Sequence, residues 1–102
     1  MPNPALTEGV YYILLSLLEP LHGYGIIQNV ESMSGGRVRL AAGTLYGAIN
    51  TLLEKHWICA IPGEKDSRKK EYHITEDGKQ ALRVELARLR ELINNGMSIL
   101  EG

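Results

Sequence analysis

The chain has 102 residues, of which 44% are hydrophobic and 23% charged, values that fit one globular domain with a modest core. A net charge of −1 excludes nucleic-acid binding through an overall basic surface, so any such function must come from local charge. The single cysteine, Cys59, excludes an intramolecular disulfide framework and fits a reducing cytoplasm, which is the expected location.

The first predicted helix carries apolar residues at helical spacing between Leu6 and Leu18. Two starts compete, Asn3-Pro4 and the cap residue Thr7, and Pro20 ends the helix. Its mostly apolar part, Val10 to Leu18, is too short to span a bilayer, and no basic region precedes it. We therefore expect neither a membrane span nor a secretory signal.

The second predicted helix opens at His22 or Gly23 within the motif HGYG and stops at Ser34-Gly35-Gly36. His22 either caps this helix or senses protonation, and the cap is the favoured interpretation. We expect Gly23 to allow close packing between helices and Tyr24 to lie in the core.

A third helix is predicted from about Ala42 to Lys55. One face carries an apolar stripe of leucine and isoleucine, and the other is polar, weakly charged and small-sided. The exposed candidates for base contacts are Thr44, Tyr46, Gly47, Asn50 and Thr51. Asn50 is the residue type that pairs with adenine edges. The alternative for Thr44, Asn50 and Thr51 is an ordinary solvent-facing position, and the alternative for Tyr46 is packing against a neighbouring element.

Two strands follow, about Trp57–Ile61 and Lys70–Thr75, and the run GEKDSRKK connects them as a long basic hairpin tip. On the second strand, alternation places Tyr72 and Ile74 in the core. The cations expected to hold DNA phosphates are Arg37, Arg39, Lys65, Arg68, Lys69 and Lys70. The alternative is a charged tip that is only solvated.

Thr75 is expected to cap a last helix that runs to about Leu100. Its apolar residues follow a spacing close to a heptad seam, which predicts pairing with the same helix of a second chain. The predicted dimer-interface residues are Leu82, Leu86, Leu89, Ile93, Met97 and Leu100. Packing onto the first helix of the same chain is the compatible alternative, and Asn94-Asn95-Gly96 marks a place for fraying or a bend.

The order of three helices, hairpin and helix predicts a mostly α fold with a small β-hairpin. Residues 1–75 would form a winged helix-turn-helix and residues 76–102 a dimerisation helix, together one compact unit. Such a dimer would present two third helices to half-sites about one DNA turn apart, roughly 34–36 Å, so the expected targets are inverted repeats.

Three segments carry a family resemblance: LLSLLEPLHGYGIIQNVE, AAGTLYGAINTLLEKHWI and SRKKEYHITEDGKQAL. In this order and spacing the chain resembles the PadR-like family of bacterial transcriptional regulators, from about Ile13 to Leu82. The resemblance implies a winged-helix fold, a homodimer, double-stranded DNA as partner and repression more often than activation. It adds no catalytic centre. The other hypothesis is a winged-helix module for protein–protein interaction without specific DNA binding.

Three positions depart from the family pattern. Ala41 stands where a serine often caps the third helix, Gly47 where proline is frequent, and His56 where glycine commonly ends the helix. We expect Ala41 to stabilise the start of the third helix by about 1 kcal/mol less than a serine cap would. At His56 we expect a positive φ, which histidine tolerates better than most residues.

The sequence indicates no enzyme, cofactor or metal. One cysteine and three scattered histidines lack ligand spacing, and no catalytic triad or phosphate-binding loop is present. Family members can respond to small molecules, so the resemblance leaves room for a small-molecule effector as a further partner. Lining an apolar cavity near the dimer interface is the candidate role of Trp57 and the tyrosines, whereas core packing is the favoured interpretation for Trp57.

Overall fold

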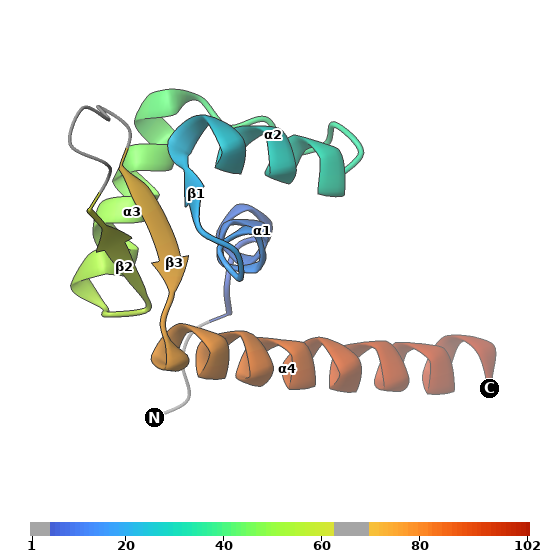
Figure 1. Cartoon of the computed structure of the whole chain (residues 1–102). Coiled ribbons are helices and arrows are strands. Elements are labelled where there is room, and N and C mark those ends of the chain that lie inside the picture. Colours follow the sequence, from blue (N-terminus) through green and yellow to red (C-terminus); the bar gives the residue numbers. More distant parts are fainter. Residues whose placement is uncertain (1–4, 63–69) are drawn as a thin grey trace.

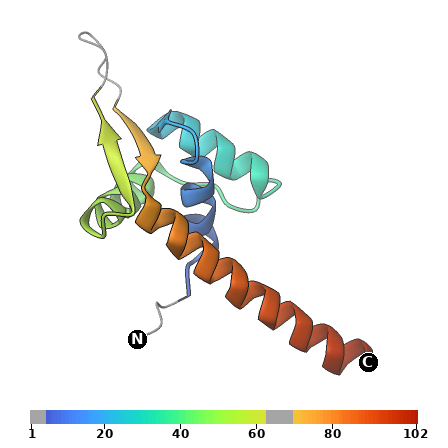
Figure 2. The same cartoon turned by 60° about the horizontal axis from the view of Figure 1, so that its bottom comes forward.

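The computed structural model describes residues 5–62 and 70–102. Its elements follow the predicted order with one addition (Figure 1), and they are α1 (Glu8–Ser16), β1 (Leu21–His22), α2 (Gly23–Met33), α3 (Ala42–Glu54), β2 (Ile58–Ile61), β3 (Glu71–Ile74) and α4 (Glu76–Glu101). Helices α1 to α3 and the sheet form a body from which the distal half of α4 projects (Figure 2). The chain therefore has the mostly α winged-helix architecture that the sequence predicts.

Side chains cap three of the helix starts. The Thr7 hydroxyl accepts a hydrogen bond from the Val10 N–H at 3.1 Å, so α1 begins after Thr7; the competing start at Asn3-Pro4 lies outside the described residues. The Thr75 hydroxyl accepts from the Gly78 N–H at 3.1 Å. His22 Nδ1 accepts from the Gly25 N–H at 3.2 Å, which confirms its predicted role as a cap.

The described sheet has three antiparallel strands in the order β1-β3-β2, where a two-stranded hairpin was predicted. Leu21 and His22 pair with Tyr72 and Glu71 of β3. Strand β1 was not predicted because two residues are too few to show the alternation of a strand. This strand ties the chain between α1 and α2 to the base of the hairpin.

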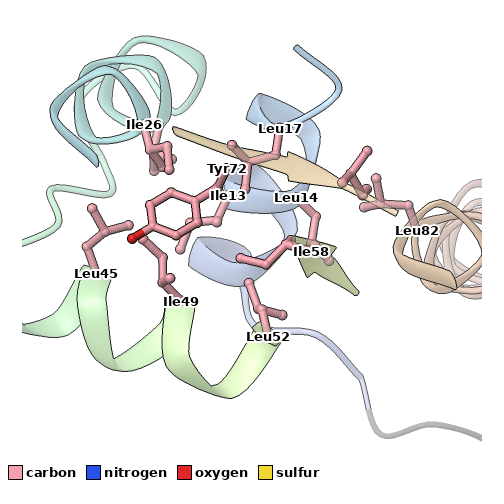
Figure 3. Packing of buried hydrophobic residues seen from close by; sticks show 12 residues of the cluster. Ile13, Leu14, Leu17, Ile26, Leu45, Ile49, Leu52, Ile58, Tyr72 and Leu82 are labelled. Atoms are coloured by element: carbon pink, nitrogen blue, oxygen red, sulfur yellow. The ribbon is translucent and has the colours of Figure 1, made fainter. Parts of the chain in front are cut away.

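The core lies where α1, α2, α3 and the sheet meet (Figure 3). Tyr72 and Ile74 are buried as predicted. Tyr24 was predicted to be in the core, and this prediction is wrong because its side chain is 66% exposed. On α2 the buried positions are Gly23, Ile26 and Val30, so Tyr24 points about 100° away from the buried stripe.

Both ends of α3 behave as the departures from the family pattern predict. Ala41 occupies the cap position without a side-chain hydrogen bond. His56 has a φ of 61°, the left-handed conformation that glycine usually supplies. The Thr75 hydroxyl donates to the His56 carbonyl oxygen at 2.6 Å, which holds this turn against the start of α4.

Helix α4 continues without interruption through Asn94-Asn95-Gly96. Near its start, Ala81, Leu82 and Glu85 are buried against the body. Glu85 Oε1 accepts a hydrogen bond from the Leu6 N–H at 3.3 Å, and the Arg88 guanidinium pairs with the same carboxylate. From residue 90 onward every residue of α4 is exposed. None of the helices in the described part of the chain is long and apolar enough to cross a membrane.

Candidate nucleic-acid interface

Helix α3 separates its two faces cleanly. Leu45, Ile49 and Leu52 are buried and fix the helix to the core. The predicted contact residues are all exposed on its other side, namely Thr44, Tyr46, Gly47, Asn50 and Thr51. The Thr51 hydroxyl donates its hydrogen bond to the Gly47 carbonyl oxygen at 3.2 Å, within the helix. In this arrangement its oxygen is left as an acceptor. Apart from Tyr46, these outward side chains are small, which suits entry of the helix into the major groove of DNA, about 12 Å wide.

Tyr46 packs against a neighbouring helix, the alternative that was left open for it, and is still partly exposed. Its side chain is 47% exposed. Its hydroxyl also lies against the backbone of Gly23, because a Cβ built on Gly23 would come within 2.5 Å of that oxygen. The ring therefore packs on the start of α2 and keeps one part at the surface.

The hairpin leaves the body beside α3. Strands β2 and β3 pair from Ile58↔Ile74 to Ile61↔Glu71. Lys70, directly before β3, is exposed. The other three predicted cations of the tip, Lys65, Arg68 and Lys69, lie outside the described residues.

The two arginines before α3 are engaged in surface ion pairs. The Arg37 guanidinium pairs with the Glu8 carboxylate, with Nε to Oε2 at 2.9 Å, and this hydrogen bond lowers the pKa of Glu8. Arg39 Nε lies 3.6 Å from Glu31 Oε1. These pairs attach the loop before α3 to α1 and α2, so a phosphate contact by either arginine requires it to exchange partners.

An open cavity of about 230 Å³ lies between α3, the start of α1 and the turn that follows α3. It is lined by Ala5, Leu6, Thr7, Val10, Ala48, Thr51, Leu52, Lys55 and Trp57. Trp57 lines this cavity and also packs against the core, which was its favoured role, and no tyrosine contributes to the lining. The Lys55 ammonium group stands 4.7 Å from the centre of the Trp57 ring, a cation–π contact at the rim. A second open cavity, of about 320 Å³ beside α4, is lined by one tyrosine, Tyr11.

The described residues contain no group of three His, Cys, Asp or Glu side chains able to hold a metal ion. Cys59 is exposed, and its Sγ lies 3.6 Å from the His73 carbonyl oxygen. The sequence did not predict the exposed hydroxyl of Tyr24. Its exposure follows from its place in α2, one residue and about 100° around the helix from the buried Gly23.

Comparison with known proteins agrees with this geometry. The profile of the Transcriptional regulator PadR-like family matches residues 12–84. A PadR family transcriptional regulator from Eggerthella lenta is similar over 90% of this chain and 80% of its own, with 25% identity and a TM-score of 0.73. A transcriptional regulator from Clostridium thermocellum is 26% identical over 92% of both chains, with a TM-score of 0.69.

Two further similarities extend the comparison. Bacillus subtilis PadR, solved in complex with operator DNA, is 26% identical over 76% of this chain and 45% of its own, with a TM-score of 0.63. A 37.1 kDa protein of transposon TN4556 from Streptomyces fradiae is 38% identical over 66 residues. The matched region covers 65% of this chain and only 18% of that protein.

Proposed function

The chain belongs to the PadR-like family of transcriptional regulators, and from this premise we propose that it is a homodimeric repressor that binds an inverted-repeat operator in double-stranded DNA. The observation that carries the proposal is the exposed face of α3. Thr44, Asn50 and Thr51 present small polar groups there, while the opposite face is anchored in the core. Such groups read base edges in the major groove.

The phosphate contacts are assigned to the cations around this face. Lys70 at the base of the hairpin, with Lys65, Arg68 and Lys69 of its tip, would neutralise phosphates beside the groove and supply affinity without sequence information. Arg37 and Arg39 would join them after leaving Glu8 and Glu31. The net charge of −1 means that DNA affinity depends on these few residues.

The homodimer is assigned to α4. The predicted seam is Leu82, Leu86, Leu89, Ile93, Met97 and Leu100, of which Leu82 is buried in its own chain and the last three are more than half exposed. Exposed leucine and isoleucine on a projecting helix favour pairing with a second copy. A two-fold dimer presents two α3 helices and therefore prefers inverted repeats.

Release of the operator is assigned to a small-molecule effector. The cavity beside Trp57 supports this part, because Ala48, Thr51 and Leu52 of α3 contribute to its lining. A bound molecule would press on the same helix that reads DNA. Trp57 is the only tryptophan of the chain, so its fluorescence would report occupancy directly.

A protein–protein interaction module is the second candidate. It is favoured by the net charge of −1 and by the scarcity of charge on the α3 face. Salt dependence separates the two functions, because DNA binding through phosphates weakens steeply as salt rises.

The deciding experiment is selection of bound sequences from a random pool of duplex DNA at two salt concentrations. Recovery of an inverted repeat, lost at the higher salt, is the expected result. Asn50→Ala should then relax preference at one base position, whereas Lys70→Ala should weaken selected and random duplexes alike and reduce the salt dependence by about one unit of slope. Absence of any enriched sequence would favour the protein-interaction module.

A further inference from the structure

The first turn of α2 lies between the two parts of the candidate interface. On one side, Gly23 is in contact with the Tyr46 hydroxyl of α3. On the other, β1 pairs His22 with Glu71, the residue directly after Lys70 at the base of the hairpin. Figure 1 shows this start of α2 above β1, beside α3 and the end of β3 from which the hairpin leaves. The surface at α2 is therefore continuous with both α3 and the hairpin.

Tyr24 is the large side chain on this turn. It is 66% exposed, although the residues before and after it, Gly23 and Gly25, are buried and half-buried. Among the described residues no hydrogen bond to its hydroxyl is found. An aromatic ring held outward with an unused O–H group is an anchor for an acceptor on a partner.

The place of this turn, between α3 and the base of the hairpin, selects the acceptor. If α3 lies in the major groove, the elements that flank it face the sugar–phosphate backbone at the groove edge, where tyrosine is among the residues that donate to phosphate oxygens. We infer that Tyr24 is a positioning residue that donates its hydroxyl proton to a DNA phosphate between the α3 contacts and the hairpin contacts. This inference rests on the proposed function.

A neutral donor has a distinctive thermodynamic signature. It forms a hydrogen bond to a charged oxygen but releases no counterion, since only cations neutralise phosphates. Loss of the hydroxyl should therefore lower affinity by the same factor at every salt concentration. A lysine contact behaves differently, because its loss also reduces the slope of log K against log salt.

The test compares Tyr24→Phe with the wild-type chain on the selected operator and on a random duplex, by fluorescence anisotropy across a salt series. Tyr24→Phe should bind both duplexes about tenfold more weakly, with an unchanged salt slope. Ser32→Ala is the matched control, because it removes an exposed hydroxyl from the last turn of the same helix and should change nothing. Equal thermal midpoints of all three proteins would show that folding is unaffected.

Three outcomes would overturn the inference. Wild-type affinity of Tyr24→Phe on both duplexes would remove the phosphate contact. A loss confined to the operator would make Tyr24 a base-reading residue instead. Failure of the wild-type chain itself to bind any duplex would reject the proposed function together with this contact, and would move Tyr24 to an interface with another protein.

Discussion

The hydroxyl oxygen of Tyr46 lies so close to Gly23 that a Cβ at position 23 would be 2.5 Å from it. This contact joins α2 to α3 at the exposed edge of the core, where Tyr46 is half exposed. Leu45, Ile49 and Leu52 hold α3 in the core, and the contact of Tyr46 with Gly23 adds a point at which α3 packs on the start of α2. A methyl group at Gly23 tests this relationship directly.

Gly23→Ala should destabilise the chain by about 1 kcal/mol, because the Tyr46 ring must swing outward to admit the methyl group. The ring is a rotatable, half-exposed side chain, so the cost stays small. In a Tyr46→Ala background the same substitution should cost little, which gives a coupling energy near 1 kcal/mol in a double-mutant cycle. Urea denaturation at one fixed protein concentration measures all four free energies. Additive effects of the two substitutions would show that the contact carries no energy.

Gly78→Ala should be far more damaging. A Cβ there would lie 2.2 Å from the Trp57 carbonyl oxygen and 2.7 Å from Ile74 Cγ1, and that carbonyl already accepts from the Thr75 N–H. Backbone cannot yield as a tyrosine ring does, so α4 must move off the sheet, at a cost of at least about 3 kcal/mol.

Gly47→Ala is the matched control for a glycine in a helix. No atom lies within 4 Å of a Cβ built there, and the residue is exposed in α3. This substitution should stabilise the chain by about 0.5–1 kcal/mol, since alanine favours helix over glycine. Equal denaturation midpoints for the two alanine variants would contradict the steric account of Gly78.

Much of the fold could be predicted from the sequence because its helices are amphipathic and their ends carry cap residues. The stripe of Leu45, Ile49 and Leu52 placed α3, and Thr75 with its acidic first turn placed α4. Strand β1 was missed because it has two residues. Tyr24 was misplaced because a buried glycine occupies the position where a large apolar residue would have marked the buried side of α2.

For the candidate site, the sequence predicted which α3 residues face outward but not what the arginines contact. The partner of Arg37 is Glu8, far away in the chain, and that of Arg39 is Glu31. Long cationic side chains find carboxylates by tertiary proximity, for which the sequence contains no periodic signal.

Titration of the buried carboxylate of Glu85 should make the free energy of unfolding depend on pH in the acidic range. Its hydrogen bond to Arg88, supported by the Leu6 N–H, holds the pKa of Glu85 below the ordinary value of 4.5, although burial opposes this. The unfolded chain therefore takes up the proton first as pH falls, and the stabilisation present at neutral pH is lost below about 4.5. Thermal midpoints should separate wild type from Glu85→Gln at pH 7 and converge in acid. Glu91→Gln removes an exposed carboxylate from the same helix and controls for the loss of charge. A difference in thermal midpoint between wild type and Glu85→Gln that is the same at all pH values would contradict the pH dependence assigned to Glu85.

The projecting half of α4 leads to the final prediction, which tests the proposed dimer. Leu92, Ile93 and Met97 are each more than half exposed, and Ile99 and Leu100 reach 86%. Ile93 lies on the predicted seam, and an aspartate there would place a carboxylate in the apolar contact with the partner helix. Ile93→Asp should raise the dimer dissociation constant at least about tenfold, and sedimentation equilibrium at micromolar concentration measures the change.

Asn95→Asp adds the same charge two residues later, about 200° around the helix and away from the seam, and should leave the dimer intact. The Ile93→Asp monomer should keep its α3 face and its affinity for a single half-site, but lose the advantage of an inverted repeat over that half-site. A wild-type chain that sediments as a monomer at tens of micromolar would reject α4 as a dimerisation helix. A dimer that tolerates Ile93→Asp would place the interface elsewhere on the body.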